Sequence, residues 1–188
     1  MGPSEKLNYM VACSRVRMTT ICQLTDNTFY RDVKSIFGSA FLKTGYTRAN
    51  IIRAWKYRDP KYSFGICDTN TNTMIGFVLM TSSSRDTLYL SYIAIADSHR
   101  GAGIGTRFMK SILRLAVKSN KTITVIPLLP VTAWYESLGF KESGFRHMYN
   151  FHLHGTRLHM KYIPRTTILS PPPKGVVYQI YGSSKHVS

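Results

Sequence analysis

The sequence predicts an α/β (α+β) fold in which helices flank a mixed, mainly antiparallel central sheet. Three observations support this prediction. Short β-rich runs, separated by polar turn residues, are interspersed with segments of helical apolar spacing. The longest β-rich run ends at a glycine-rich loop, and a strongly amphipathic helical segment follows that loop directly. At 188 residues, 44% of them hydrophobic, the chain suits one packed core.

The first half of the chain contains two predicted helices between predicted strands. Phe29, Val33 and Phe37 recur at helical spacing, and Gly45 is well placed to end that helix. In the last β-rich run of this half, apolar side chains occupy both parities, which favours a central strand covered on both faces. We expect strands at 18–24, 62–68, 74–82 and 86–96 and helices at 29–43 and 47–58.

The second half contains the amphipathic helix and a shorter helix. Pro130 is suited to the start of the shorter helix and Gly139 to its C-terminal cap. Phe140 then enters the next strand. We expect helices at 106–119 and 131–138, a strand at 122–126, and a closing hairpin of strands at 148–153 and 157–163 around Gly155.

Composition divides the chain into three parts. Residues 1–17 form a leader, residues 18–163 form the domain, and residues 164–188 form a Pro-rich extension. The run Pro171, Pro172 and Pro173 cannot continue a sheet, although a segment at 176–181 could add an edge strand. We therefore expect one folded domain with a distinct C-terminal segment.

The net charge of +16 indicates an anionic partner, for which nucleic acid and a phosphate-rich cofactor are the two candidates. The three cysteines are an odd number at no metal-ligand spacing. No secretory signal and no run of about 18 apolar residues is present, so we expect no membrane span. These features together predict an intracellular, cytoplasmic protein.

A glycine-rich loop from Ser98 to Thr106 follows the long strand and opens the amphipathic helix. Consecutive backbone N–H groups and the positive end of the helix then point at one place, which favours an anion. The nucleotide-triphosphate loop requires Gly-Lys-Ser/Thr, and the dinucleotide loop requires a third glycine at position 106. Neither pattern is present, so the spacing excludes both of these classes of phosphate loop.

Two motifs resemble those of GNAT superfamily N-acetyltransferases. Arg100-x-x-Gly103-x-Gly105, after a strand that ends at Ile95, resembles their acetyl-CoA signature. The run Trp134-Tyr135-Glu136-Ser137-Leu138-Gly139-Phe140 resembles their later Y-E-x-L-G-F segment. The two motifs occur in the expected order, and the predicted elements over residues 18–163 are similar in order to those of a GNAT fold. The resemblance implies an N-acetyltransferase that uses acetyl-CoA as co-substrate and an amine of a protein or small molecule as acceptor.

The resemblance also implies roles for particular residues. The backbone of the long strand pairs with the pantetheine amides, and a backbone N–H near Ile95 stabilises the oxyanion. Tyr135 protonates the departing thiolate, since a phenol is protonated at neutral pH. The cofactor-binding residues implied are Ile93, Ala94, Ile95, Arg100, Gly101, Ala102, Gly103, Ile104, Gly105 and Thr106.

Helical geometry suggests how Tyr135 is presented. Trp134 and Leu138 are four residues apart and should face the core together, which turns Tyr135 about 100° away, towards a cleft. The packing alternative is that the Tyr135 ring only fills space and its hydroxyl finds a partner.

The sequence leaves the general base open. The strands at 86–96 and 122–126 offer no carboxylate after Asp86, and Leu128 stands where the family usually has an asparagine. A water relay, Asp97, His99 or an amine that arrives neutral would each serve. A pseudoenzyme that binds acetyl-CoA without turnover is one alternative.

A basic nucleic-acid-binding module is another alternative, with aromatic residues such as Tyr57 and Tyr62 as stacking platforms. The histidines of the closing hairpin, His147, His152, His154 and His159, are read as strand-surface residues and not as a metal site, because no cysteine or carboxylate is clustered with them in the sequence.

Overall fold

The computed structural model describes residues 19–147 and 157–164 of the chain. A seven-stranded sheet, in the order β1-β2-β3-β4-β5-β7-β6, runs through its centre. Neighbouring strands are antiparallel except for the parallel pair β4 and β5. The strands are β1 Thr19–Gln23, β2 Phe64–Asp68, β3 Thr73–Ser84, β4 Thr87–Ile95, β5 Thr122–Val125, β6 Lys141–His147 and β7 Arg157–Tyr162. The predicted mixed, mainly antiparallel sheet is confirmed.

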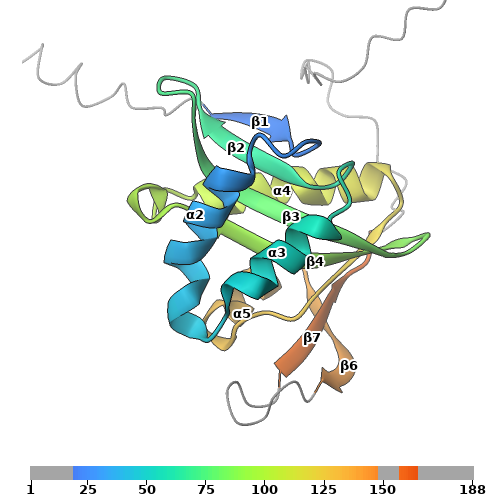
Figure 1. Cartoon of the computed structure of the whole chain (residues 1–188). Helices are drawn as coiled ribbons and strands as arrows, with labels where there is room; N and C mark the ends of the chain where they lie inside the picture. Colours follow the sequence, from blue (N-terminus) through green and yellow to red (C-terminus); the bar gives the residue numbers. More distant parts are fainter. Residues whose placement is uncertain (1–18, 148–156, 165–188) are drawn as a thin grey trace, which may run out of the picture.

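Helices cover both faces of the sheet (Figure 1). The α-helices are α2 Tyr30–Phe41, α3 Arg48–Lys56, α4 Ile104–Lys118 and α5 Thr132–Ser137, with short 3-10 turns η1 Leu42–Thr44, η2 Asp97–His99 and η3 Leu129–Val131. α2 and α3 pack with Phe77, Leu79 and Ala94 of the sheet into one core. α4 and α5 pack into a second, larger core on the opposite face, around Val78, Leu90 and other strand residues.

Local sequence explains where the helices begin and end. The backbone N–H of Thr47 donates to Oδ1 of Asn50 at 2.7 Å, forming half of a capping box at the start of α3. Gly45 adopts φ +84°, a left-handed conformation that stops the helical chain after η1. Gly139, at φ +92°, likewise follows α5. The predicted roles of Gly45 and Gly139 are therefore confirmed.

The predicted elements match the observed ones with shifts at their ends. α4 begins at Ile104, two residues before the prediction, because Gly103 and not Gly105 makes the left-handed turn into the helix. The strand expected after Phe140 is β6, which occupies 141–147. The predicted strand at 148–153, the turn at Gly155, the leader at 1–17 and the segment at 176–181 lie outside the described residues.

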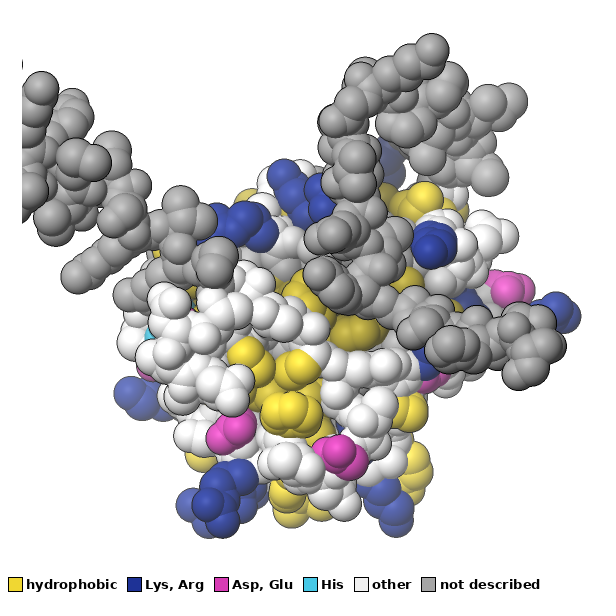
Figure 2. Space-filling view, turned by 90° about the horizontal axis from the view of Figure 1, so that it is seen from above, with side chains coloured by type: hydrophobic (Ala, Val, Ile, Leu, Met, Phe, Trp, Pro, Cys, Tyr) yellow, Lys and Arg dark blue, Asp and Glu magenta, His cyan; other side chains and the backbone are white. Residues whose placement is uncertain are grey.

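None of the helices in the described ranges is long and apolar enough to cross a membrane. Lys and Arg side chains are spread around the face in Figure 2, where they surround an exposed hydrophobic patch. The basic excess of the sequence is thus a property of the surface.

Candidate active site

The sheet separates between β4 and β5. β4 pairs with β3 along its whole length, as far as Ile95 opposite Gly76. It pairs with β5 only from Thr87 to Tyr89. From Leu90 onward the edge of β4 that faces β5 is therefore open.

Strand alternation identifies the backbone groups that face this gap. Ala96 donates its N–H to the carbonyl of Ile75 in β3 at 2.8 Å. Because the N–H and C=O groups of successive residues point to opposite sides of an antiparallel strand, Ala94 also turns towards β3. The N–H groups of Ile93 and Ile95 consequently face the gap.

A cavity of about 680 Å³ occupies the gap. It takes Leu90, Ile95 and Val125 from the core on the α4 side and Tyr92 and Ala94 from the core on the α2 side. The cavity therefore connects the two faces of the sheet, so that two molecules approaching from opposite faces can meet in it.

The glycine loop forms one end of the cavity. Gly101 (φ +80°) and Gly103 (φ +69°) adopt left-handed conformations that favour glycine, and Gly103 is the N-cap of α4. The first N–H groups of the helix have no intrahelical partner and point out of its N-terminus with the positive end of the dipole. A Cβ on Gly105 would lie 3.4 Å from the Ile95 side chain, so this glycine allows α4 to begin against the end of β4. The end of β4 and an anion-attracting helix start thus share one wall.

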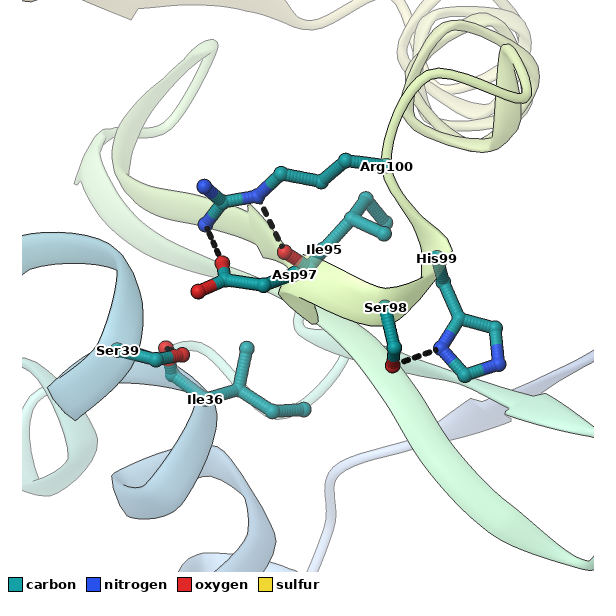
Figure 3. A network of polar contacts seen from close by, with 7 residues as sticks. All are labelled: Ile36, Ser39, Ile95, Asp97, Ser98, His99 and Arg100. Atoms are coloured by element: carbon teal, nitrogen blue, oxygen red, sulfur yellow. Dashed lines mark hydrogen bonds and ion pairs between the residues drawn. The ribbon is translucent and has the colours of Figure 1, made fainter.

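The Arg100 side chain is committed to the end of the strand. Its Nε donates to the Ile95 carbonyl at 2.9 Å, and its guanidinium forms an ion pair with Asp97 at 2.8 Å. Figure 3 shows both contacts, with His99 turned away from them towards Ser98. The Ile95 carbonyl therefore already accepts a hydrogen bond from Arg100, whereas the Ile95 N–H faces the gap. Arg100 in this way determines which backbone groups of Ile95 a ligand meets.

Most of the residues predicted to contact the cofactor line this cavity. Gly101, Gly103, Ile104, Gly105 and Thr106 do so together with Ile93, Ala94, Ile95 and Arg100. Ala102 is outside the lining, and its carbonyl accepts a hydrogen bond from Arg107 at 3.0 Å. Arg107 therefore supports the loop from the exposed side.

Tyr135 lies on the cavity wall with only 4% of its surface exposed. Its ring packs edge-on against Trp134 and Phe140, at centroid distances of 4.8 and 5.2 Å. Burial, followed by the charges of Tyr89 and Tyr46, raises the pKa of Tyr135 above its ordinary value. The phenol is therefore protonated throughout the physiological range.

The predicted orientation of α5 is wrong in one respect. Leu138 is buried as expected, but Tyr135 is more buried than Trp134, which is only half-buried. Trp134 turns instead towards the start of α4, where its indole N–H donates to the Thr106 hydroxyl at 3.0 Å. The Thr106 hydroxyl gives the indole N–H the polar partner that an apolar core does not offer. Both aromatic residues line the cavity.

The structure distinguishes between Asp97 and His99, the two side chains considered as the general base. Asp97 is held by Arg100 and is absent from the cavity lining, whereas His99 belongs to the lining and its Nδ1 lies 2.8 Å from the Ser98 hydroxyl. Within the described ranges, no three His, Cys, Asp or Glu side chains gather at a metal-binding spacing. His152 and His154 lie outside those ranges.

One wall of the cavity was missed by sequence reasoning. Phe41 and Tyr46, from the end of α2 and the turn before α3, join Tyr92 of β4 in an aromatic cluster. Their ring centroids are 5.3 to 5.6 Å apart in edge-to-face arrangements. No local sequence motif predicts this wall, because its three aromatic residues come from separate elements that only the fold brings together.

A mixed sheet that opens between two parallel strands, with a glycine loop and a helix start at the opening, defines the fold class of the acyl-CoA N-acyltransferases. The sequence matches the model of the acetyltransferase (GNAT) family over residues 27–140, and the chain belongs to that family. It is an acetyl-CoA-dependent N-acetyltransferase.

Solved structures support the fold assignment. The ribosomal-protein-S18-alanine N-acetyltransferase from Escherichia coli superposes with a TM-score of 0.62 at 18% identity, covering 86% of this chain and 100% of that one. An aminoglycoside 6'-N-acetyltransferase in complex with coenzyme A gives 0.60 at 11% identity, covering 78% and 96%. Ard1 from Thermoplasma volcanium gives 0.62 at 19% identity, covering 77% and 97%. No curated protein gives a significant match to the sequence.

Proposed function

We propose that acetyl-CoA enters the gap between β4 and β5 from the α4 side and that an acceptor amine reaches the thioester from the α2 side. The observation that carries this proposal is the single cavity lined from both cores. The pyrophosphate rests on the backbone from Gly101 to Thr106, where an anion gains the N–H groups and dipole of the helix start. The pantetheine runs along the open edge of β4, in reach of Ile93 and Ile95.

The residues at the thioester divide the chemistry of acyl transfer. The amine attacks the thioester carbonyl, and the N–H of Ile95 stabilises the oxyanion that forms. The tetrahedral intermediate collapses with release of the thiolate, to which Tyr135 donates its hydroxyl proton. Burial keeps this phenol protonated, so the donor is ready at every physiological pH.

The amine must also lose a proton. Among the described residues on the cavity wall, His99 carries the side chain best suited to this role, since imidazole is a common general base. We assign it the removal of the amine proton through an intervening water. The ion pair of Asp97 with Arg100 supports a structural role for that carboxylate.

The location of the protein and the bounds of its catalytic domain are also proposed. The cysteine count and the phosphate-rich co-substrate support an intracellular location, and residues 18–163 are proposed as the catalytic domain.

Thermal unfolding with and without acetyl-CoA tests the proposal. A ligand that binds only the folded state stabilises it by about 2.7 kcal/mol at a hundredfold excess over its dissociation constant. We expect a clear rise in Tm with acetyl-CoA and release of free CoA thiol when an acceptor amine is added. A Tm unchanged by millimolar acetyl-CoA would refute the proposal.

A further inference from the structure

A second groove lies between α2 and α3, outside the catalytic cavity. It has a volume of about 470 Å³. Its floor is apolar, with the buried Phe37 and Ile51, and its rim carries the exposed Leu42 and the exposed cations Arg31, Lys34 and Arg48. Ser35 and Ser39 add hydroxyl groups to the same rim. The groove is thus a small apolar trough surrounded by positive charge.

The three cations of this rim have no acidic partner. Among the described residues the one ion pair joins Arg100 to Asp97, and Arg31, Lys34 and Arg48 take no part in it. Asp32 lies on the same helix, but it is outside the groove lining and takes no part in an ion pair among the described residues. From residue 30 to residue 58 the acidic Asp32 is opposed by seven basic residues: Arg31, Lys34, Lys43, Arg48, Arg53, Lys56 and Arg58. Such a concentration of positive charge attracts an anion.

The groove and the catalytic cavity lie on two sides of the same helical turn. Gly38, Ser39 and Leu42 face the groove, whereas Ala40 and Phe41 face the cavity. An α-helix with its side chains is about 10–12 Å across, so the two sites are separated by a distance on the order of 10 Å. A peptide must pass around the helix, a path of about 16–19 Å, which an extended chain covers in about five to six residues.

We propose that the groove binds an acidic segment of a polypeptide acceptor whose amine, about five to six residues away, enters the catalytic cavity. This inference rests on the proposed function, because it places the acceptor on the α2 side. Arg31 and Arg48 offer forked donors that match carboxylates, and the apolar floor accepts a neighbouring apolar side chain. The cations repel a polycationic acceptor from the same surface.

A polypeptide fits the groove better than a nucleic acid does. Nucleic-acid binding by charge uses a long track of about 6–10 phosphate contacts, whereas this rim offers three cations around an apolar floor. An acidic peptide satisfies the rim and the floor together.

Fluorescence anisotropy tests the groove without turnover. The probe is a labelled, N-terminally blocked peptide with three consecutive glutamates, and its control is the same peptide with glutamines. The variant Arg31→Gln, Lys34→Gln, Arg48→Gln is compared with Lys110→Gln, Arg114→Gln, Lys118→Gln, which removes the same charge from the exposed side of α4. Three exposed charge contacts together contribute about tenfold in affinity. We expect a loss of about tenfold for the glutamate peptide in the groove variant and less than twofold in the α4 variant.

Three results would overturn the inference. Equal losses in both triple variants would show general electrostatics, and equal binding of the two peptides would show no recognition of acid. Tighter binding of a single-stranded oligonucleotide, lost in the groove variant, would make the groove a nucleic-acid site.

A kinetic arm tests the link to the active site. In peptides with a free amine, the glutamates are moved along the chain, and KM should be lowest when they begin about five to six residues from the amine. A KM independent of their position would separate the groove from catalysis. The Tm rise with acetyl-CoA, expected to be the same in the groove variant and the parent, keeps this test distinct from the proposed function: its absence in the parent would refute the acetyl-CoA site alone.

Discussion

The indole N–H of Trp134 donates a hydrogen bond to the hydroxyl of Thr106 at 3.0 Å. Thr106 belongs to the first turn of α4, directly after the glycine loop, and Trp134 precedes Tyr135 on α5. The two motifs noticed separately in the sequence are therefore joined by one polar contact. This contact sets the position of the proposed proton donor relative to the proposed phosphate site.

Breaking that contact should affect cofactor binding and chemistry together. In Trp134→Phe the hydrogen bond is lost, at a cost of about 0.5–1.5 kcal/mol, and we expect both acetyl-CoA affinity and kcat to fall. The matched control is Trp55→Phe, since Trp55 donates a similar indole bond to Asn27 at 2.9 Å, outside the cavity lining. If the two variants lose stability alike and keep full affinity and kcat, the contact has only a structural role. A double-mutant cycle with Thr106→Val measures the coupling directly.

The glycine loop is tested by a substitution at Gly103. Valine there obstructs the approach of a pyrophosphate and also strains a backbone held at φ +69°. We expect Gly103→Val to lower the Tm and to abolish the additional rise that acetyl-CoA gives the parent. Gly45→Val imposes comparable strain at φ +84° outside the loop and should keep the ligand-induced rise. A full rise in Gly103→Val would mean that the phosphate binds elsewhere.

The proton-donor role is tested by Tyr135→Phe. The ring contacts with Trp134 and Phe140 remain, so acetyl-CoA affinity should barely change. Single-turnover acetyl transfer should slow by roughly 10²-fold, the lower range for a lost general acid. Slow hydrolysis of acetyl-CoA serves as the assay until an acceptor is found. Equal rates in parent and variant would leave Tyr135 as a packing residue.

The buried phenol also predicts a pH dependence of stability. Its pKa in the folded state is raised above the unfolded value of about 10, so the folded state holds this proton more tightly. The stabilising contribution is complete below pH about 10 and is lost as the pH rises towards the folded pKa. Urea unfolding above pH about 10 should therefore show a smaller loss of stability in Tyr135→Phe than in the parent. Parallel curves would indicate that the phenol is accessible to water.

The assignment of the base is tested by comparing His99→Gln with Asp97→Asn. The first variant should slow single-turnover transfer by roughly 10²-fold. The second removes an ion pair with Arg100 and should act mainly on acetyl-CoA affinity. The reverse pattern would transfer the role of base to Asp97.

Several features of this protein were predictable from sequence because they depend on neighbouring residues. Helical spacing identified the amphipathic α4, and turn chemistry identified Gly45 and Gly139, since a left-handed φ is a local property of the backbone. The loop from Gly101 to Thr106 and the segment at Tyr135 were recognised as ordered motifs, and both lie within the residues 27–140 that match the family. The fold class and the acetyl-CoA chemistry follow from these local patterns.

Tertiary structure alone decided the rest, because the features concerned join residues far apart in the chain. The open edge of β4 arises from its short pairing with β5, and register is a property of two strands. The reversal of Trp134 towards Thr106 requires α4 to lie beside α5. Likewise, the cation-rimmed groove exists only because α3 brings Arg48 next to Arg31 and Lys34 of α2. A single sequence records each of these side chains but not its neighbours, and burial, pairing and charge balance all depend on the neighbours.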